Sequence, residues 1–240
     1  MSEDGIGAPL RRKEDRRFLT GTGTYTDDIN RPGQAHAVIV RSPHAHAGIA
    51  SIDTAAAAAA PGVIAVFTSA DTTADDLGGL PCGWGITQSD GSPMNEPAHP
   101  VLAVGKVRHV GDPVAMVIAD TLAAAHDGAG LVEVDYESLP AVIAGPAAIA
   151  DGAPSVHDDA PGNLCFAWEI GDKAATDEAF AKAAHVTTIE VTNPRMVANP
   201  IEPRAAVGDY DTGMDSHTLY TTSQCPHVVR LLMGAFVLKL

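Results

Sequence analysis

Cysteine is scarce in this 240-residue sequence, and its three cysteines, Cys82, Cys165 and Cys225, lie far apart. No Cys-x-x-Cys pair is present, so the sequence indicates neither a structural zinc site nor a set of disulfides. The same spacing could not hold an iron–sulfur cluster, which needs several thiolates close together. Isolated thiols are typical of proteins from a reducing compartment, and we therefore predict a cytoplasmic location.

Positive charge is also limited, because the sequence has 15 lysines and arginines but 30 aspartates and glutamates. The formal net charge is therefore −15. Nucleic-acid-binding surfaces are normally basic, so we expect no nucleic-acid partner. An acidic surface also disfavours docking on an anionic membrane. The N-terminal residues are polar and charged, unlike a signal peptide. No apolar run reaches the ~18 residues of a membrane-spanning helix, so we expect no membrane insertion.

The sequence is 45% hydrophobic, which is enough for a sizeable core. Glycines and a proline disfavour regular structure in residues 1–19, which we predict to form an extended arm. Residues 71–100 are rich in Gly and Pro and predict a long surface loop. Because the predicted strands come in pairs and the helices are few, the pattern favours an α+β fold over a doubly wound parallel sheet. We expect strands at Ala35–Arg41, Gly48–Asp53, Val63–Thr68, Pro113–Ala119 and Leu131–Tyr136, and helices at 54–60, capped by Thr54, and at 121–130, capped by Asp120.

Residues 141–162 have the Ala, Gly and Pro bias of a linker. We place a domain boundary there, which gives an arm (1–19), a first domain (20–140), the linker and a second domain (163–240). In the second domain a final helix should follow Gln224, with Pro226 in its first turn. The other expected elements are strands at Leu164–Ile170, Val186–Thr192, Arg204–Tyr210 and His217–Thr222, and a helix at Ala174–Ala184.

The final helix is apolar around nearly its whole circumference, with Lys239 as its one late charge. A helix that is apolar on all sides is normally buried. No residue after Leu240 is available to bury it, so we expect further chain or a partner to pack there.

Several groups that could carry chemistry have structural interpretations. His44 and His46 form a His-x-His pair, but zinc or iron would need a third ligand, and none is close in sequence. Cys225 and His227 suggest a thiolate–imidazole pair, yet an i, i+2 spacing on a helix points them to different sides. The remaining candidates are Gly21 and Gly23, which we interpret as turn glycines because the rest of a nucleotide-binding loop is absent, and the carboxylate pairs Glu133 with Asp135 and Asp27 with Asp28, which we interpret as solvated faces or caps.

Two positions near the end of the chain are more informative. Glu202 lies in NPIEPR, where Arg204 shares its face on an extended segment, so the two side chains either hold a turn or line an active-site wall. Gln224 is an amide at a predicted strand-to-helix junction. Its NH2 group can donate to an anionic or oxo ligand beside the N–H groups of the helix start, or it can act as a cap. We expect no metal bound directly by side chains of this chain.

Seven segments are spread in order along the chain from residue 6 to residue 230: Ile6–Ile29 (IGAPLRRKEDRRFLTGTGTYTDDI), Arg41–Ile49 (RSPHAHAGI), Pro61–Thr68 (PGVIAVFT), His99–Thr121 (HPVLAVGKVRHVGDPVAMVIADT), Val132–Val142 (VEVDYESLPAV), Asn199–Asp211 (NPIEPRAAVGDYD) and Thr218–Arg230 (TLYTTSQCPHVVR). Together they resemble the molybdenum-binding large subunit of the xanthine dehydrogenase and aldehyde oxidase family. The branch they are most similar to is the large chain of aerobic carbon monoxide dehydrogenase-type hydroxylases. An ordered run of motifs is more specific than any one of them.

The resemblance implies an α/β hammerhead domain at residues 20–140 and the beginning of a molybdenum-cofactor-binding domain at residues 163–240. It implies that Gln224 is a catalytic and cofactor-binding residue, because the glutamine of the family's Thr-Ser-Gln motif reaches the oxo ligand of molybdenum. A neutral donor there stabilises the oxo group without supplying an acid proton. The residue after this glutamine is often asparagine in the branch, whereas here it is Cys225.

The implied activity is hydroxylation with water as the oxygen source, on carbon monoxide, an aldehyde or an N-heterocycle. The implied cofactor is molybdopterin cytosine dinucleotide with molybdenum, joined in the carbon monoxide branch by a copper–sulfur bridge. FAD and 2Fe-2S clusters are implied on a medium and a small partner subunit, in a dimer of heterotrimers.

Three family features expected later in the subunit do not occur in this sequence: the GGGFG loop, the substrate loop and the general-base glutamate. We therefore expect an N-terminal portion of the large subunit that is inactive alone. The alternatives are a non-catalytic split or vestigial fragment that only binds partner subunits and, less favoured, an unrelated α+β binding protein.

Overall fold

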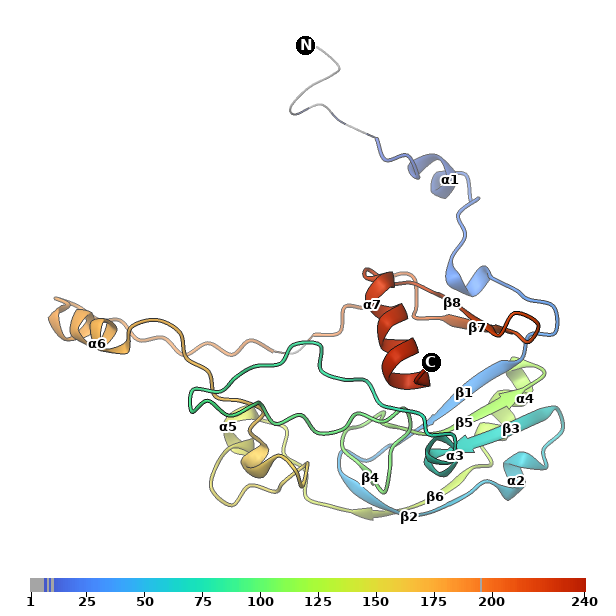
Figure 1. Ribbon diagram of the computed structural model, residues 1–240, viewed down its shortest axis with the longest axis horizontal. Coiled ribbons are helices and arrows are strands. Elements are labelled where there is room, and N and C mark those ends of the chain that lie inside the picture. The colour runs from blue at the N-terminus through green and yellow to red at the C-terminus, as the bar shows by residue number, and fades with distance from the viewer. Residues whose placement is uncertain (1–6, 8, 10, 195) are drawn as a thin grey trace. The chain divides into compact units, whose positions relative to one another are not determined.

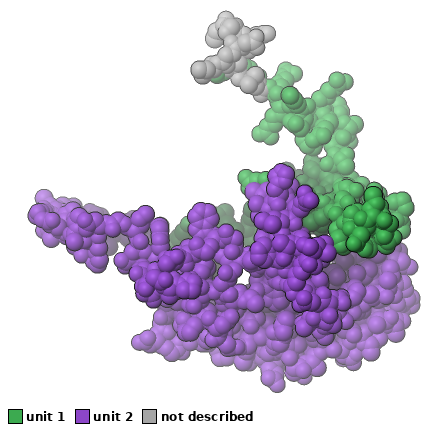
Figure 2. Space-filling model, in the orientation of Figure 1, with its two compact units in different colours: residues 1–34, 192–224 green, residues 35–191, 225–240 purple. Residues whose placement is uncertain are grey.

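The computed structural model describes residues 7, 9, 11–194 and 196–240. The chain divides into two compact units, the first made of Met1–Gln34 and Thr192–Gln224 and the second of Ala35–Val191 and Cys225–Leu240 (Figure 2). Most of residues 1–10 in the predicted arm lie outside the described part. Where the arm is described, a short helix, α1 (Asp15–Leu19), forms instead of extended chain.

A three-stranded antiparallel sheet forms the centre of the second unit (Figure 1). Its strands are β1 (His36–Arg41), β5 (Pro113–Ala119) and β3 (Val63–Thr68), in the order β1-β5-β3. The central strand β5 is the most buried, as its continuous apolar run predicts. The helix α4 (Leu122–Ala129) packs on β1 and β5. Its cap is Thr121, whose hydroxyl accepts from Ala124 N at 3.1 Å, so the predicted Asp120 cap is wrong by one residue.

A second antiparallel sheet, in the order β4-β2-β6, completes this unit's core. Its strands are β4 (Lys106–Val107), β2 (Ala47–Asp53) and β6 (Glu133–Ser138). Ala47 and Val107 from this sheet meet Val114 of β5 and Ala103 in a buried cluster. All strand pairs in the described chain are antiparallel and helices lie between them, which confirms the α+β prediction.

Two short helices flank β3. The first, α2 (Ala55–Ala58), begins after Thr54, but Asp53 Oδ1 rather than Thr54 accepts from Ala55 N, at 2.8 Å. The second, α3 (Ser69–Ala74), occupies the start of the predicted 71–100 loop. Thr68 and Asp71 form a capping box there, with Asp71 Oδ2 accepting from Thr68 N at 2.7 Å. The rest of the loop, residues 75–100, contains one isolated bridge between Thr87 and Pro93.

Two predicted strands in the second half do not form. Residues 164–170 donate and accept only scattered bonds, such as Asn95 N to Cys165 O at 2.8 Å and Ser89 N to Ala167 O at 2.9 Å. Residues 186–192 are exposed and pair with no strand in the described chain. A β-rich sequence needs a partner strand for its backbone groups, and none lies beside these segments. The helices of this region are α5 (Gly145–Ala148), the 3₁₀ turn η2 (Pro161–Asn163) and α6 (Lys173–Lys182), which Asp172 caps.

The first unit contains the hairpin of β7 (Ala206–Asp211) and β8 (Ser216–Thr221), close to the predicted ranges, and the 3₁₀ turn η1 (Thr26–Asp28). The final helix belongs to the second unit and starts as predicted, with Pro226 in the first turn of α7 (Pro226–Leu231) before a π-helical segment, η3 (Leu232–Leu238). Gly78 N donates to Val237 O at 2.9 Å and Lys239 pairs with Asp76 at 2.6 Å, so this helix packs beside the chain that follows α3. Within the described residues, no helix is both long and apolar enough to cross a membrane.

Candidate functional site

Glu202 joins three segments of the first unit that are far apart in sequence. Its Oε1 accepts from the backbone N–H of Thr26 at 3.2 Å and from the hydroxyl of Thr222 at 2.8 Å. The hydroxyls of Thr26 and Thr222 lie 3.1 Å apart, and Thr26 is buried. The predicted pair with Arg204 is absent from the ion pairs of the described residues. Glu202 holds together distant segments, not its own turn.

The hydrogen bonds to Glu202 favour its ionised form. The Thr26 backbone bond is the largest cause, followed by the Thr222 hydroxyl, and together they lower the pKa of this carboxyl. The nearby charge of Asp28 opposes the effect without reversing it. The side chain is therefore a carboxylate at neutral pH, able to accept both bonds.

The hairpin that carries Thr222 is fixed by further contacts within the first unit. Arg31 pairs with Asp209 of β7 at 2.6 Å, and its guanidinium lies 5.8 Å from the ring centre of Tyr220 on β8. Tyr210 and His217 stack across the two strands, with ring centres 4.6 Å apart. Contacts of Tyr220 and His217, on opposite faces of β8, therefore fix this strand within the first unit.

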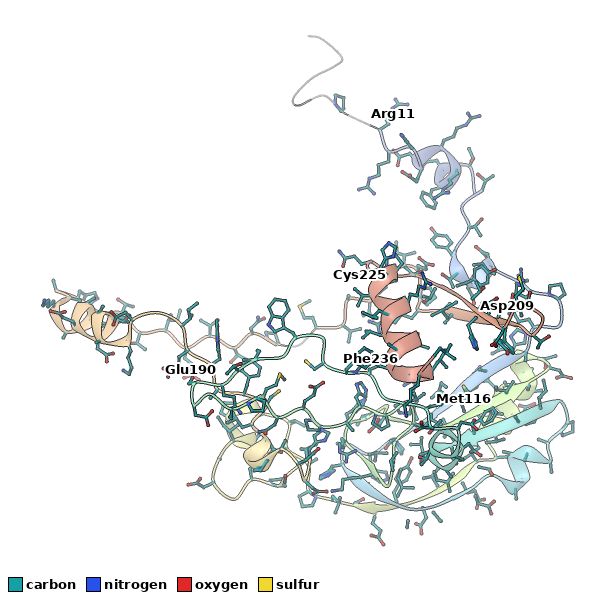
Figure 3. The ribbon with its side chains drawn as sticks, viewed as in Figure 1. Arg11, Met116, Glu190, Asp209, Cys225 and Phe236 are labelled. Atoms are coloured by element: carbon teal, nitrogen blue, oxygen red, sulfur yellow. The ribbon has the colours of Figure 1, made fainter. Side chains whose placement is uncertain are left out.

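Gln224 lies two residues beyond Thr222, in the bend that precedes α7. Figure 3 marks the next residue, Cys225, at the start of that helix. The Gln224 side chain is exposed, and no hydrogen bond from its carboxamide occurs among the described residues. Its two N–H donors are therefore not used by another described group, and donation to a ligand stays a prediction for this position.

Both histidines of the His-x-His pair contact neighbouring residues of the second unit. His46 is buried, and its Nδ1 lies 2.8 Å from the carbonyl oxygen of Pro140. His44 packs on the ring of Tyr136, with centroids 4.8 Å apart, and lies 3.4 Å from the hydroxyl of Ser138. The described residues contain no group of three or more His, Cys, Asp or Glu side chains that could hold a metal ion.

The other candidates have local roles. Gly21 lies in the turn after α1 with a positive φ of 70°. Gly23 lies outside that turn, and a Cβ on it would lie 2.6 Å from the ring of Phe18. Asp28 caps η1 by accepting from Tyr25 N at 2.9 Å. Glu133 and Asp135 lie on the exposed face of β6. All three cysteines are exposed.

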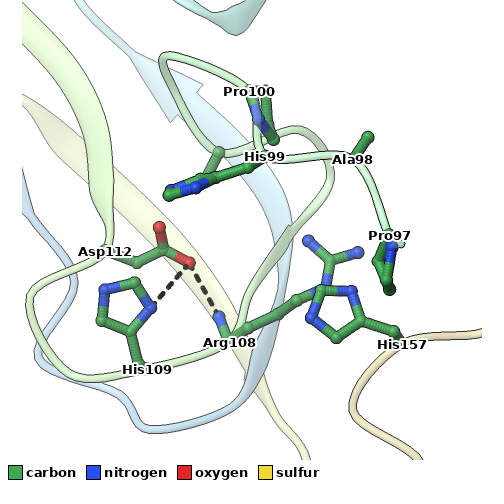
Figure 4. Close-up of a pocket in the computed structure, with 9 residues that line it drawn as sticks. Pro97, Ala98, His99, Pro100, Arg108, His109, Asp112 and His157 are labelled. Atoms are coloured by element: carbon green, nitrogen blue, oxygen red, sulfur yellow. Dashed lines mark hydrogen bonds and ion pairs between the residues drawn. The ribbon is translucent and has the colours of Figure 1, made fainter. Parts of the chain in front are cut away.

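A cavity of about 310 Å³ in the second unit was not predicted from the sequence (Figure 4). Asp112 lies in it, accepts from Arg108 N at 2.9 Å and is 3.7 Å from His109 Nδ1. Arg108 Nε is buried without a hydrogen-bond partner among the described residues. The sequence feature that could have indicated this cavity is Gly111, which lies between His109 and Asp112. Its φ of 90° lets the chain turn back there. The remaining lining residues are Pro97, Ala98, His99, Pro100, Ala103 and His157.

His157 in this cavity should titrate below its usual value. Burial is the main cause of the lowered pKa, followed by the positive charge of Arg108, with a smaller effect of Lys106. We expect Arg108→Gln to raise the pKa of His157, because the positive charge of Arg108 is the second-largest cause that lowers it. NMR titration of the His157 ring proton measures this, and the matched variant Lys106→Gln should give a smaller rise. A larger rise for Lys106→Gln would contradict the order of causes.

The sign of the linked stability change follows from the same shift. The unfolded chain binds the proton on His157 more readily than the folded chain does, so the free energy of unfolding falls as the pH drops below the usual value of 6.5.

Comparison with known proteins assigns a domain family to each half of the sequence. Residues 20–140 match the family described as aldehyde oxidase and xanthine dehydrogenase, a/b hammerhead domain. Residues 156–240 match the molybdopterin cofactor-binding domain. The second match begins within the segment that composition marks as a linker.

Individual relatives match the chain over nearly its whole length. It is 38% identical to the nicotine 6-hydroxylase large subunit of Paenarthrobacter nicotinovorans, over 99% of this chain and 28% of that protein. It is 39% identical to the carbon monoxide dehydrogenase large chain of Afipia carboxidovorans, over 96% of this chain and 29% of that protein. The structure of quinoline 2-oxidoreductase from Pseudomonas putida 86 superposes with a TM-score of 0.83 at 36% identity, over 95% of this chain and 28% of that one.

The chain thus spans less than a third of the length of these relatives. The domain matches, the identities and the superposition agree with the resemblance of the seven segments. The chain belongs to the aldehyde oxidase and xanthine dehydrogenase family, with an a/b hammerhead domain followed by the start of a molybdopterin cofactor-binding domain.

Proposed function

We propose that this chain serves as the N-terminal part of the large subunit of a molybdenum hydroxylase, and that it is inactive without the rest of that subunit. The observation that carries the proposal is the match of 95% or more of the chain to large subunits of such enzymes, at 36–39% identity. Their names mention carbon monoxide, nicotine and quinoline. The corresponding substrate class is carbon monoxide, an aldehyde or an N-heterocycle.

Gln224 is the residue that we propose to contact the cofactor. Molybdenum bound by molybdopterin supplies redox chemistry for hydroxylation with oxygen from water. The exposed carboxamide of Gln224, with no described partner, fits a role as a neutral hydrogen-bond donor to an oxo ligand. An amide donates without giving up a proton, so it favours developing negative charge on the acceptor throughout turnover. Glu202 and the threonines hold the chain on the N-terminal side of this donor.

The finer features of the cofactor and partners are part of the proposal. They are the cytosine dinucleotide form of molybdopterin, FAD on a medium subunit, 2Fe-2S clusters on a small subunit, and a dimer of heterotrimers in the cytoplasm. One relative, at 37% identity, is named as subunit gamma of a dehydrogenase complex, which supports an assembly of several subunits. A structural relative is a Cu,Mo-CO dehydrogenase, so the elemental analysis below should include copper.

A second candidate is a non-catalytic fragment that only binds partner subunits. The exposed apolar side chains of the second unit between residues 170 and 191 favour a binding role, because exposed apolar groups of this kind normally contact a partner. The most exposed of them are Ile170 at 83%, Ile189 at 80% and Val191 at 75%. This surface suits either candidate, so metal content must decide between them.

The experiment that tests the function is isolation of the native protein from its source through a tag at the N-terminus. We expect molybdenum close to one atom per chain by elemental analysis, together with flavin and iron–sulfur absorbance from co-purifying subunits. Sequencing the gene beyond codon 240 should reveal a frame encoding GGGFG. A metal-free 240-residue product with partner subunits attached would support the second candidate. Hydroxylase activity of the 240-residue chain alone would contradict the expected inactivity.

A further inference from the structure

One carboxylate oxygen sets the direction of a chain of hydrogen bonds in the first unit. The Thr222 hydroxyl donates to Glu202 Oε1 at 2.8 Å. A hydroxyl has a single hydrogen, so Thr222 cannot also donate to Thr26. In the 3.1 Å contact between the two threonines, Thr26 is therefore the donor. Both hydroxyls point along one path toward Glu202, which also accepts from Thr26 N at 3.2 Å.

The backbone around Glu202 is stiff. Pro200 and Pro203 flank the segment and fix their own φ angles. Glu202 directly precedes Pro203, which restricts it to extended conformations. The backbone of such a segment therefore loses little further conformational entropy when the carboxylate is held.

The anchored hydroxyl lies at the start of the turn that carries Gln224. Thr222 is the first residue after β8, and only Ser223 separates it from Gln224. The Gln224 side chain has no described hydrogen bond of its own. The position of its backbone therefore depends on the neighbouring residues that are held.

We propose that Glu202 is a positioning residue that fixes the Thr222–Gln224 turn through the Thr222 hydroxyl and so orients the Gln224 carboxamide. The benefit of this fixed orientation to catalysis rests on the proposed function of Gln224. The carboxylate acts through Thr222 and does not itself touch Gln224 or a cofactor. A group placed in advance loses less freedom when its ligand binds, which is the energetic value of such an anchor.

Selective labelling tests the proposal directly, because the chain has only three glutamines, Gln34, Gln88 and Gln224. In the 240-residue chain labelled with ¹⁵N-glutamine, NMR relaxation gives an order parameter for each backbone amide. We expect Gln224 near the rigid value of about 0.85 in the wild type, and below about 0.6 in Thr222→Val and Glu202→Leu. Gln88, in the second unit, should not change in these variants.

Two further variants separate positioning from general stability. Glu202→Gln keeps an Oε1 acceptor for both bonds, so Gln224 should stay rigid. Asp209→Asn weakens the Arg31 ion pair on the same hairpin and should leave the Gln224 order parameter unchanged. Thr222→Val is close in shape to the wild type, so it keeps the test valid if Glu202→Leu does not fold.

A rigid Gln224 in folded Thr222→Val would overturn the proposal. Equal loss of order in Thr222→Val and Asp209→Asn would overturn it too, because Glu202 would then only stabilise the unit. The measurement needs no cofactor. A native protein without molybdenum would thus defeat the proposed function and leave this result as it stands.

Discussion

Replacing Gln224 with alanine in the complete, cofactor-loaded enzyme is expected to lower kcat by about 100- to 1,000-fold, the usual effect of removing one preorganised donor. The carboxamide is exposed and has no described protein partner. The substitution therefore removes a donor to the ligand without breaking contacts inside the first unit. Because the lost interaction strengthens as charge develops, kcat and kcat/KM should fall by similar factors. Steady-state kinetics on enzyme with matched molybdenum content measures both.

A second variant and a control sharpen this prediction. Gln224→Glu exchanges the donor for an acceptor that is negatively charged at neutral pH, so its loss should be at least as large as that of the alanine variant. Gln88→Ala makes the same chemical change in the 75–100 loop, where the side chain donates to Ser92 and to the carbonyl of Pro93. It should keep the wild-type rate. Gln224→Ala with wild-type turnover would remove Gln224 from the site.

The sequence predicts elements well where a single physical signal controls them. Continuous apolar runs predict β3 and β5 with the observed bounds, because mostly buried or half-buried strands need no regular polar alternation. The helix α3 was overlooked although Thr68 and Asp71 have the spacing of a capping box. Residues 164–170 and 186–192 have strand composition, but composition does not supply a neighbouring strand, and none is present in the described chain.

In the candidate site too, the sequence predicts what depends on neighbouring residues but not the contacts between distant segments. Gln224 could be singled out because its neighbours in the sequence place it before a helix. The partner of Glu202 was predicted to be Arg204, two residues away, because spacing along an extended chain is a local signal. Its observed partners, Thr26 and Thr222, are 176 and 20 residues away, and only the fold brings them together. The cavity lined by Arg108 and Asp112 likewise includes His157, which is far from these two residues in the sequence.

The second prediction with a large expected effect concerns the core of the second unit. Val117 is fully buried at the centre of β5, opposite Val38 on one neighbouring strand and Val66 on the other. The helix α4 closes on it, since a Cβ on Gly128 would lie 3.0 Å from Val117 Cγ1. Val117→Asp places a carboxylate where neither water nor a hydrogen-bond donor reaches it. We expect it to lower the free energy of unfolding by more than about 4 kcal/mol.

That loss is comparable with the whole stability of a typical domain, so Val117→Asp should leave the second unit largely unfolded at 25 °C. Urea titration followed by circular dichroism measures it. Ile64→Asp is the matched control, because Ile64 lies on the adjacent strand β3 with 63% of its surface exposed. A solvated aspartate there costs within about 1 kcal/mol, mainly through lost strand propensity. Similar urea midpoints for the two variants would mean that β5 is not the centre of the core. A folded Val117→Asp with a collapsed Ile64→Asp would reverse the assignment of the inner and outer faces.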